Sequence, residues 1–148
     1  MRLMPSILIV DDNPADVVLA REALAGTAYR SQIKNAEDGV EAMAFLNRTG
    51  THAKAVRPDL VILDLNLPKK GGLAVLAAMK AYPDLRRIPV VIFSTSRLNE
   101  DIARSYELGA NCYVSKPGNL DEFFAALKAI EEFWFGTASL PQVKRTGE

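Results

Sequence analysis

The feature of this sequence that most constrains its fold is a regular alternation of short apolar runs with longer segments of helical spacing. The apolar runs are rich in β-branched residues, and we expect strands at residues 6–10, 31–36, 60–63, 89–94 and 112–115. The segments between and after them predict helices at residues 14–24, 38–47, 73–81, 99–108 and 119 to about 135. Strands that alternate with helices predict an α/β fold built on a parallel sheet.

The composition of the runs indicates how the strands are ordered. Three runs are continuously apolar, as expected of central strands that helices cover on both faces, whereas residues 31–36 alternate and predict an edge strand. Right-handed crossovers leave few topologies, and a doubly wound five-stranded sheet in the order 2-1-3-4-5 is the commonest. A polar connection at residues 47–58 and a flexible tail at residues 136–148 complete the expected organisation.

Charge and hydropathy exclude several classes of protein. The 148 residues include 18 basic and 18 acidic side chains, so there is no basic excess of the kind that binds nucleic acid. No apolar run approaches the roughly 20 residues needed to span a bilayer, and the N-terminus lacks a secretory cleavage pattern. We therefore expect a cytoplasmic protein, in which the single Cys112 packs as a small residue beside a strand.

Polar and charged residues follow four of the predicted strands. In a doubly wound sheet, ligands bind at the carboxyl ends of the strands, next to the point where the strand order reverses. This sequence places the pairs Asp11-Asp12, Ser94-Thr95 and Ser115-Lys116 there, together with Asp64. Three carboxylates in one cleft repel each other, and a hard divalent cation relieves that repulsion. The pattern predicts a Mg²⁺ site, with Mn²⁺ as an alternative, suited to phosphoryl transfer.

Individual roles follow from position. Asp64 is the expected nucleophile because it projects from the central strand, between the acidic pair and Lys116, which supplies a second positive centre. Asp12 should bind the metal directly, Asp11 directly or through water, and the backbone carbonyl of Asn66 is a further expected ligand. Taken alone, each of these residues has an ordinary interpretation as a turn residue, a helix cap or a solvated lysine. Their coincidence at one edge favours the joint interpretation.

Four motifs give the chain from Ile7 to about Glu131 a resemblance to the receiver domains of two-component response regulators. They are ILIVDDNP, LVILDLNLPKKGG, PVVIFSTS and CYVSKP. The resemblance implies a flavodoxin-like receiver fold over residues 6–131, with a helical extension and tail at residues 132–148. It implies Asp64 as phosphoacceptor, Mg²⁺ bound by Asp11, Asp12 and Asp64, and Lys116 as the phosphoryl contact. Such a protein catalyses only its own phosphorylation and dephosphorylation and is not otherwise an enzyme.

The same resemblance implies a conformational switch. Ser94 corresponds to the switch hydroxyl, and Tyr113 to the aromatic switch residue. A phosphoryl group on Asp64 would draw the Ser94 hydroxyl toward it, and Tyr113 would move into the vacated space. Asn66 and Ser96 correspond to positions that tune water access, and the Lys116-Pro117 peptide is expected to be cis.

The end of the last helix carries three adjacent aromatic residues, Phe133, Trp134 and Phe135. Because they cannot share one side of a helix, some should be exposed. They could fold back over the loop at residues 49–56, but we favour a dimer or partner interface, where aromatic residues are enriched. With this segment, IEEFWFGTASLP, the sequence resembles the small response regulators that accompany bacterial phytochromes. That resemblance implies a phytochrome-type sensor histidine kinase as phosphodonor and a homodimer; a histidine phosphotransferase is another partner of related receivers.

Two other functions remain as alternatives. A Mg²⁺-dependent phosphohydrolase also uses an aspartate nucleophile, but it expects a DxD motif at one strand end, where this chain has Asp64-Leu65-Asn66. A pseudo-receiver that acts only as a scaffold would ordinarily lack part of the set formed by the three aspartates and Lys116, which is complete here.

Overall fold

The computed structural model describes residues 4–141 and contains five strands, five α-helices and two short helical turns. The strands are β1 (Ser6–Val10), β2 (Gln32–Ala36), β3 (Leu60–Leu63), β4 (Val90–Ser94) and β5 (Cys112–Ser115). The helices are α1 (Pro14–Ala25), α2 (Gly39–Asn47), α3 (Gly72–Ala81), α4 (Asn99–Glu107) and α5 (Leu120–Glu131). A 3₁₀ turn, Gly50–His52, lies in the predicted polar connection, and a π-helical turn, Glu132–Thr137, follows α5. None of the helices in this part of the chain is long and apolar enough to cross a membrane.

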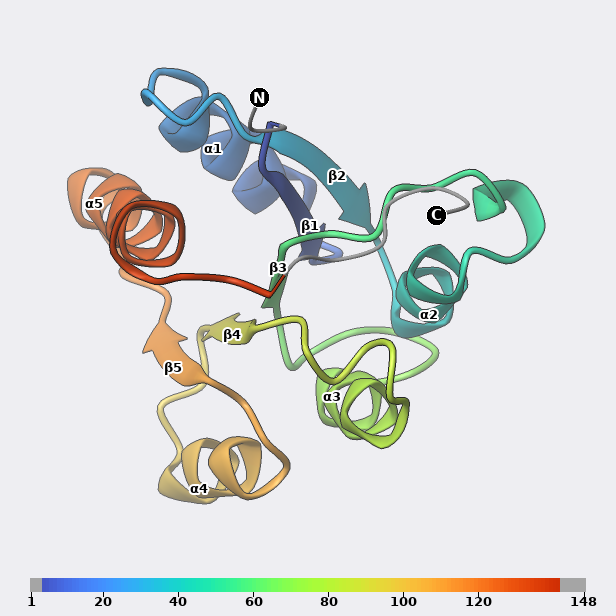
Figure 1. The fold of residues 1–148 in the computed structure, drawn as a ribbon. Coiled ribbons are helices and arrows are strands. Elements are labelled where there is room, and N and C mark those ends of the chain that lie inside the picture. The colour runs from blue at the N-terminus through green and yellow to red at the C-terminus, as the bar shows by residue number, and fades with distance from the viewer. Residues whose placement is uncertain (1–3, 142–148) are drawn as a thin grey trace.

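All five strands are parallel, in the order β2-β1-β3-β4-β5, which confirms the predicted fold class and strand order. Helices α1 and α5 cover one face of the sheet, and α2, α3 and α4 cover the other (Figure 1). Each face has its own apolar core, one packed beneath α1 and α5 and the other beneath α2 and α3. The strands β1, β3 and β4 are buried along their whole length, whereas in β2 exposed and partly buried residues alternate up to the buried Ala36, as expected of an edge strand.

Local sequence signals explain where the helices begin. The side chain of Asn13 accepts hydrogen bonds at the start of α1, where Pro14 occupies the first helical position. Asp38 caps α2 in the same way, and Asn119 caps α5 by accepting from the backbone N–H of Glu122. The observed bounds differ from the predicted ones by at most one residue, except at the end of α5.

The chain beyond α5 departs from the predicted continuous helix, because the π-helical turn changes which side chains face the protein. Phe135 is buried, and its ring lies 6.3 Å from that of Tyr29. For Phe135, the predicted exposed interface is therefore wrong, and so is the alternative of folding over residues 49–56. Phe133 is 51% exposed and contacts Trp134 edge to face, at 5.0 Å between ring centroids. Residues 142–148 of the expected flexible tail lie outside the described residues.

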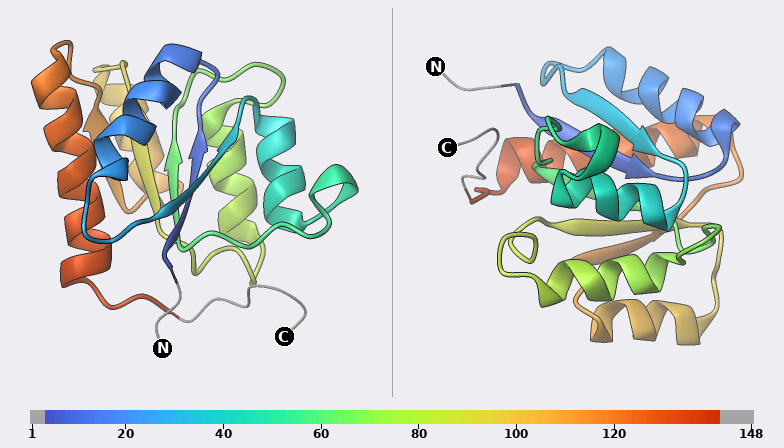
Figure 2. Two further views of the ribbon diagram at one scale, coloured as in Figure 1. Left: turned by 90° about the horizontal axis from the view of Figure 1, so that it is seen from above. Right: turned by 90° about the vertical axis from the view of Figure 1, so that its right-hand side faces the viewer.

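Two polar contacts fasten the end of α5 to the loop between α1 and β2. The Ser31 hydroxyl donates a hydrogen bond of 2.7 Å to the Glu131 carboxylate, which is only 1% exposed. Next to it, the hydroxyl of Tyr29 donates to the carboxylate of Glu132. Figure 2 shows α5 running alongside α1, which places its last turn near this loop.

Candidate functional site

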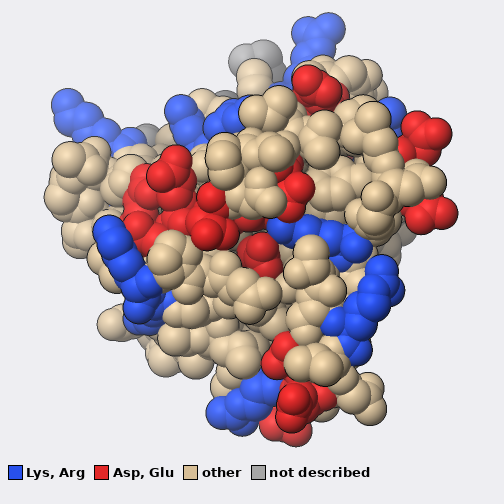
Figure 3. Space-filling model, turned by 180° about the vertical axis from the view of Figure 1, so that it is seen from behind, with Lys and Arg blue, Asp and Glu red and all other residues tan. Residues whose placement is uncertain are grey.

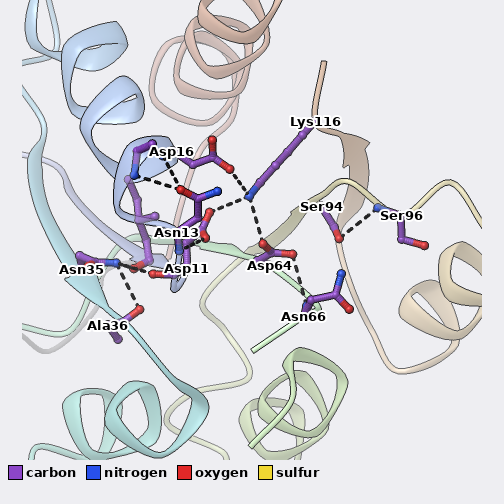
Figure 4. A network of polar contacts seen from close by, with 12 residues as sticks. Asp11, Asn13, Asp16, Asn35, Ala36, Asp64, Asn66, Ser94, Ser96 and Lys116 are labelled. Carbon is purple, nitrogen blue, oxygen red and sulfur yellow. Dashed lines mark hydrogen bonds and ion pairs between the residues drawn. The ribbon is translucent and has the colours of Figure 1, made fainter. Parts of the chain in front are cut away.

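The sheet register brings the predicted site residues together. Val10 pairs with Leu63, Leu63 with Ile92, and Ser94 with Ser115, so β4 and β5 end two residues beyond β1 and β3. The residues that follow these strands therefore meet at one edge of the sheet, where Asp11, Asp64 and Lys116 point toward one another (Figure 4). Backbone hydrogen bonds, such as that from the Asp64 N–H to the Val10 carbonyl at 2.9 Å, hold the strand ends in this position.

Lys116 is the centre of the site. Its ammonium donates hydrogen bonds to the carboxylates of Asp11 at 2.8 Å, Asp16 at 2.8 Å and Asp64 at 3.0 Å. The Lys116 side chain is 4% exposed, and those of Asp11 and Asp64 are 7% and 10% exposed. A buried ammonium is stable only when its donors find partners, and here three carboxylates provide them.

Asp16 is a residue of the site that the sequence reasoning missed. It lies in the first turn of α1, where the side chain of Asn13 accepts from its backbone N–H at 3.3 Å. The Asn-Pro pair after β1 is a local sequence signal that could have indicated it. A helix that starts directly after β1 has its first turn beside the strand ends.

Within the site, the electrostatic surroundings shift the pKa values of Asp11 and Lys116. Burial raises the pKa of Asp11 above its ordinary value, because the hydrogen bonds from Lys116 and from the Asn13 backbone only partly offset the loss of solvation. Burial alone would lower the pKa of Lys116. The hydrogen bonds to Asp11 and Asp16 and the attraction of Asp11 and Asp64 outweigh it, so the pKa of Lys116 rises and the ammonium stays charged.

Three carboxylates form a group that could hold a metal ion. Oxygen atoms of Asp11, Asp12 and Asp64 all lie within 4.8 Å of one another. Asp12 is exposed, whereas Asp11 and Asp64 are buried, so the group opens to solvent on one side. On the side of the molecule opposite to that seen in Figure 1, acidic side chains gather near the middle of the surface (Figure 3). Hard carboxylate oxygens at this spacing fit a partly hydrated divalent cation such as Mg²⁺ or Mn²⁺.

The predicted switch residues lie next to this group. Ser94 is fully buried at the end of β4, and its hydroxyl oxygen accepts a hydrogen bond of 3.4 Å from the Ser96 N–H. Tyr113 is partly buried on β5, and its hydroxyl donates to the backbone carbonyl of Ser96 at 2.8 Å. The loop after β4 therefore contacts both predicted switch residues.

The loop after Asp64 approaches the strand end closely. Asn66 donates its backbone N–H to the Asp64 carboxylate at 3.4 Å. A Cβ atom at Gly72 would lie 2.2 Å from the carbonyl oxygen of Asp64, so only glycine fits there without displacing the backbone.

One expectation for the site is wrong: no described peptide bond is cis, so the bond between Lys116 and Pro117 is trans. Cys112 is partly buried within β5, and its burial raises the pKa of the thiol, as befits a packing residue.

Comparison with known proteins places this geometry in a family. Residues 7–128 match the response regulator receiver domain. The chain is 46% identical over 135 residues to response regulator Rcp1 of Synechocystis sp., covering 91% of this chain and 92% of the relative.

Solved structures agree with the sequence comparison. The crystal structure of the phosphorylated cyanobacterial phytochrome response regulator RcpA is similar, with a TM-score of 0.92 and 50% identity, over 95% of this chain and 100% of that one. The crystal structure of Mn²⁺-bound Rcp1 is also similar, with a TM-score of 0.89 and 45% identity, over 93% and 99% of the two chains. Fold, strand-end residues and sequence thus lead to one conclusion: the chain belongs to the response regulator receiver domain family.

Proposed function

We propose that this receiver accepts a phosphoryl group on Asp64 from a sensor histidine kinase, in a reaction that needs a divalent cation, and signals by a change of shape. The observation that carries the proposal is the placement of the buried Lys116 ammonium 3.0 Å from the Asp64 carboxylate, with the carboxylates of Asp11 and Asp12 on the same strand edge. A nucleophilic carboxylate flanked by fixed positive charge is what phosphoryl transfer requires.

The chain's own residues supply most of this chemistry. An Asp64 oxygen would attack the phosphorus of a phosphohistidine, forming a P–O bond while the P–N bond to the imidazole breaks and the imidazole nitrogen takes up a proton. Asp11, Asp12, Asp64 and the backbone carbonyl of Asn66 would hold Mg²⁺ or Mn²⁺, which neutralises charge on the phosphoryl oxygens when bound. Lys116 would contact one of those oxygens, because it already lies against Asp64.

The proposed switch starts at Ser94. A phosphoryl group on Asp64 adds charge and strong acceptor oxygens beside the buried hydroxyl. When the Ser94 hydroxyl turns to donate to the phosphoryl group, the hydrogen bond that its oxygen accepts from the Ser96 N–H changes. The carbonyl of Ser96 also accepts from Tyr113, so a shift of this loop would move the aromatic side chain and change the surface around α4 and β5.

The similarity to Rcp1 and RcpA supports a phytochrome-type histidine kinase as the phosphodonor. A cavity of about 260 Å³ beside the site would admit the donor imidazole, and its lining includes Leu19, Pro117 and Leu120 as well as Lys116. A histidine phosphotransferase is a second candidate partner with the same chemistry.

The balanced charge and the lack of a membrane-spanning helix among the described residues support a cytoplasmic protein that does not bind nucleic acid.

The proposed receiver domain comprises residues 6–131, and residues 132–148 form an extension. We further propose that the protein is a homodimer and that this extension forms its interface. Phe133 and Trp134 support it, because a half-exposed phenylalanine packed against a partly exposed tryptophan is an aromatic surface of the kind enriched in interfaces. Phe135 has no part in it because it is buried against Tyr29.

The test is the intact mass of the protein after incubation with a small-molecule phosphodonor and Mg²⁺. We expect one phosphoryl adduct that requires the metal and is absent from Asp64→Asn. Asp84→Asn is the matched control, because the Asp84 side chain is 81% exposed and belongs to another part of the chain. Asp84→Asn should therefore form the adduct like the wild type. A folded wild-type protein that forms no adduct would instead be the scaffold-type pseudo-receiver, and steady release of phosphate from added esters would indicate the phosphohydrolase.

A further inference from the structure

Asp16 contacts Lys116 from outside the group of carboxylates that could hold a metal ion. An ammonium has three N–H donors, and Lys116 directs them to three different carboxylates. Two of the acceptors, Asp11 and Asp64, belong to the candidate metal group, whereas Asp16 does not.

The start of α1 fixes Asp16 in place. Asn13 accepts hydrogen bonds from the backbone N–H groups of Ala15 at 3.0 Å and Asp16 at 3.3 Å, and its own N–H donates to the Asp11 carboxylate at 2.9 Å. The backbone of Asp16 is thereby tied to the strand end that carries Asp11. Its side chain is 22% exposed, so its 2.8 Å bond to Lys116 is more shielded from solvent than an ordinary surface ion pair.

This geometry creates a competition for Asp11 and Asp64. Each now accepts from Lys116, and each also belongs to the group that would bind a divalent cation. A carboxylate that binds a metal is a weaker acceptor for an ammonium. Lys116, at 4% exposure, cannot replace a lost partner with bulk water. It needs a carboxylate that the metal does not use, and of the three that accept from it within residues 4–141, Asp16 is the one outside the candidate metal group.

We infer that Asp16 is a positioning residue, which holds the Lys116 ammonium beside Asp64 when a divalent cation occupies Asp11 and Asp64. The inference rests on the proposed function, and Asp16 acts only through Lys116. Without Asp16, the ammonium depends on Asp11 and Asp64 alone and competes with the cation for them.

The test combines two measurements on Asp16→Ala: the dissociation constant for Mg²⁺ by calorimetry, and the rate constant of phosphoryl incorporation from a small-molecule donor at saturating Mg²⁺. We expect weaker Mg²⁺ binding and incorporation slowed by about tenfold, the size of the loss of one charge-assisted hydrogen bond. Asp16→Glu, which keeps the carboxylate, should restore part of both values. Asp121→Ala is the matched control and should resemble the wild type, because Asp121 is an exposed acid in the first turn of α5.

A double-mutant cycle separates this role from a direct effect of the lost charge. In a Lys116→Ala background, Asp16→Ala should leave Mg²⁺ affinity unchanged, because the ammonium that it positions is gone. An equal loss of affinity in both backgrounds would overturn the inference, as would near wild-type values for Asp16→Ala. If Asp16→Ala does not fold, Asp16→Asn is expected to change both values in the same direction. A wild type that takes no phosphoryl group would refute the proposed function, while the Mg²⁺ measurements would still decide the role of Asp16.

Discussion

At the scale of single residues, the site depends on backbone positions as much as on charged side chains. Gly72 lies so close to Asp64 that a Cβ atom there would meet the carbonyl oxygen of Asp64 at 2.2 Å and the Cα of Leu65 at 2.6 Å. Both contacts are with backbone atoms that cannot turn aside like a flexible side chain. The position of the Asp64 backbone therefore depends on the absence of a side chain at Gly72.

Gly72→Ala should lower the free energy of unfolding by about 1–3 kcal/mol, the usual effect of forcing an extra methyl group into a packed region. It should also slow phosphoryl incorporation, because relief of the clash moves Asp64. Urea unfolding and intact-mass kinetics measure the two effects. Gly26→Ala is the control, since a Cβ atom there would have no neighbour within 4 Å and the φ of Gly26 is −91°. Equal stability of the two variants would contradict the prediction.

At the scale of elements, side-chain hydrogen bonds and ion pairs at the ends of helices stabilise the fold. Asp38 caps α2 by accepting from the Glu41 N–H at 2.7 Å, and Lys69 lies 3.4 Å from its other carboxylate oxygen. The bond from Glu41, assisted by Lys69, lowers the pKa of Asp38 below its ordinary value of 3.8. The folded protein therefore binds a proton at Asp38 less readily than the unfolded chain does.

A lowered pKa means that the stability contributed by Asp38 is fully present above about 3.8 and is lost as the pH falls through the folded-state pKa. Asp38→Asn, which keeps a capping oxygen without the charge, should be less stable than the wild type at neutral pH. The difference should shrink toward the lowest pH at which both proteins remain folded. Urea unfolding of both proteins across this range tests it, and a pH-independent difference would contradict the assignment.

The end of α5 offers a second prediction at this scale. Ser31→Ala removes the hydroxyl that donates to the buried Glu131 carboxylate. A buried charged group that loses a partner should destabilise the protein by about 1–3 kcal/mol. Thermal or urea unfolding measures the loss, and Ser31→Thr, which retains a hydroxyl, should recover much of it. A Ser31→Ala protein as stable as the wild type would show that water replaces the hydroxyl without cost.

At the scale of the whole molecule, the aromatic residues after α5 have separate roles. Phe133→Ala combined with Trp134→Ala should shift the protein toward the monomer in sedimentation velocity, because an aromatic surface is lost. Val40→Ala is the matched control, since Val40 is 55% exposed on α2, on the other face of the sheet. Unchanged association of the double variant would argue against this interface.

Phe135→Ala should act differently, since Phe135 is 4% exposed within the core beneath α1 and α5. It should lower the free energy of unfolding by about 3 kcal/mol, as expected for removal of a buried aromatic ring. Chemical unfolding measures this effect directly. A loss of association without any loss of stability would place Phe135 at an interface instead of in the core.

The sequence was sufficient for the sheet order and for the meeting of Asp11, Asp64 and Lys116, because residues at the ends of neighbouring parallel strands must share an edge. For Asp16 it held only the local signal of the Asn-Pro helix start, which does not show that the side chain reaches Lys116. Nor could it separate Phe135 from its neighbours, because the π-helical turn shifts the helical phase by an amount that periodicity does not encode. The trans bond before Pro117 likewise depends on tertiary context.

The separation of Lys116 from its partners along the chain has a consequence for biosynthesis. Asp11, Asp16 and Asp64 precede it by 105, 100 and 52 residues. A ribosome makes the acidic side chains first, so a nascent chain that ends before β5 carries these carboxylates without the Lys116 ammonium that pairs with them in the folded protein. In such a chain, these carboxylates would stay hydrated or pair with a cation from the solvent. Synthesis of β5 and Lys116 thus completes the sheet and supplies the ammonium that these three carboxylates share.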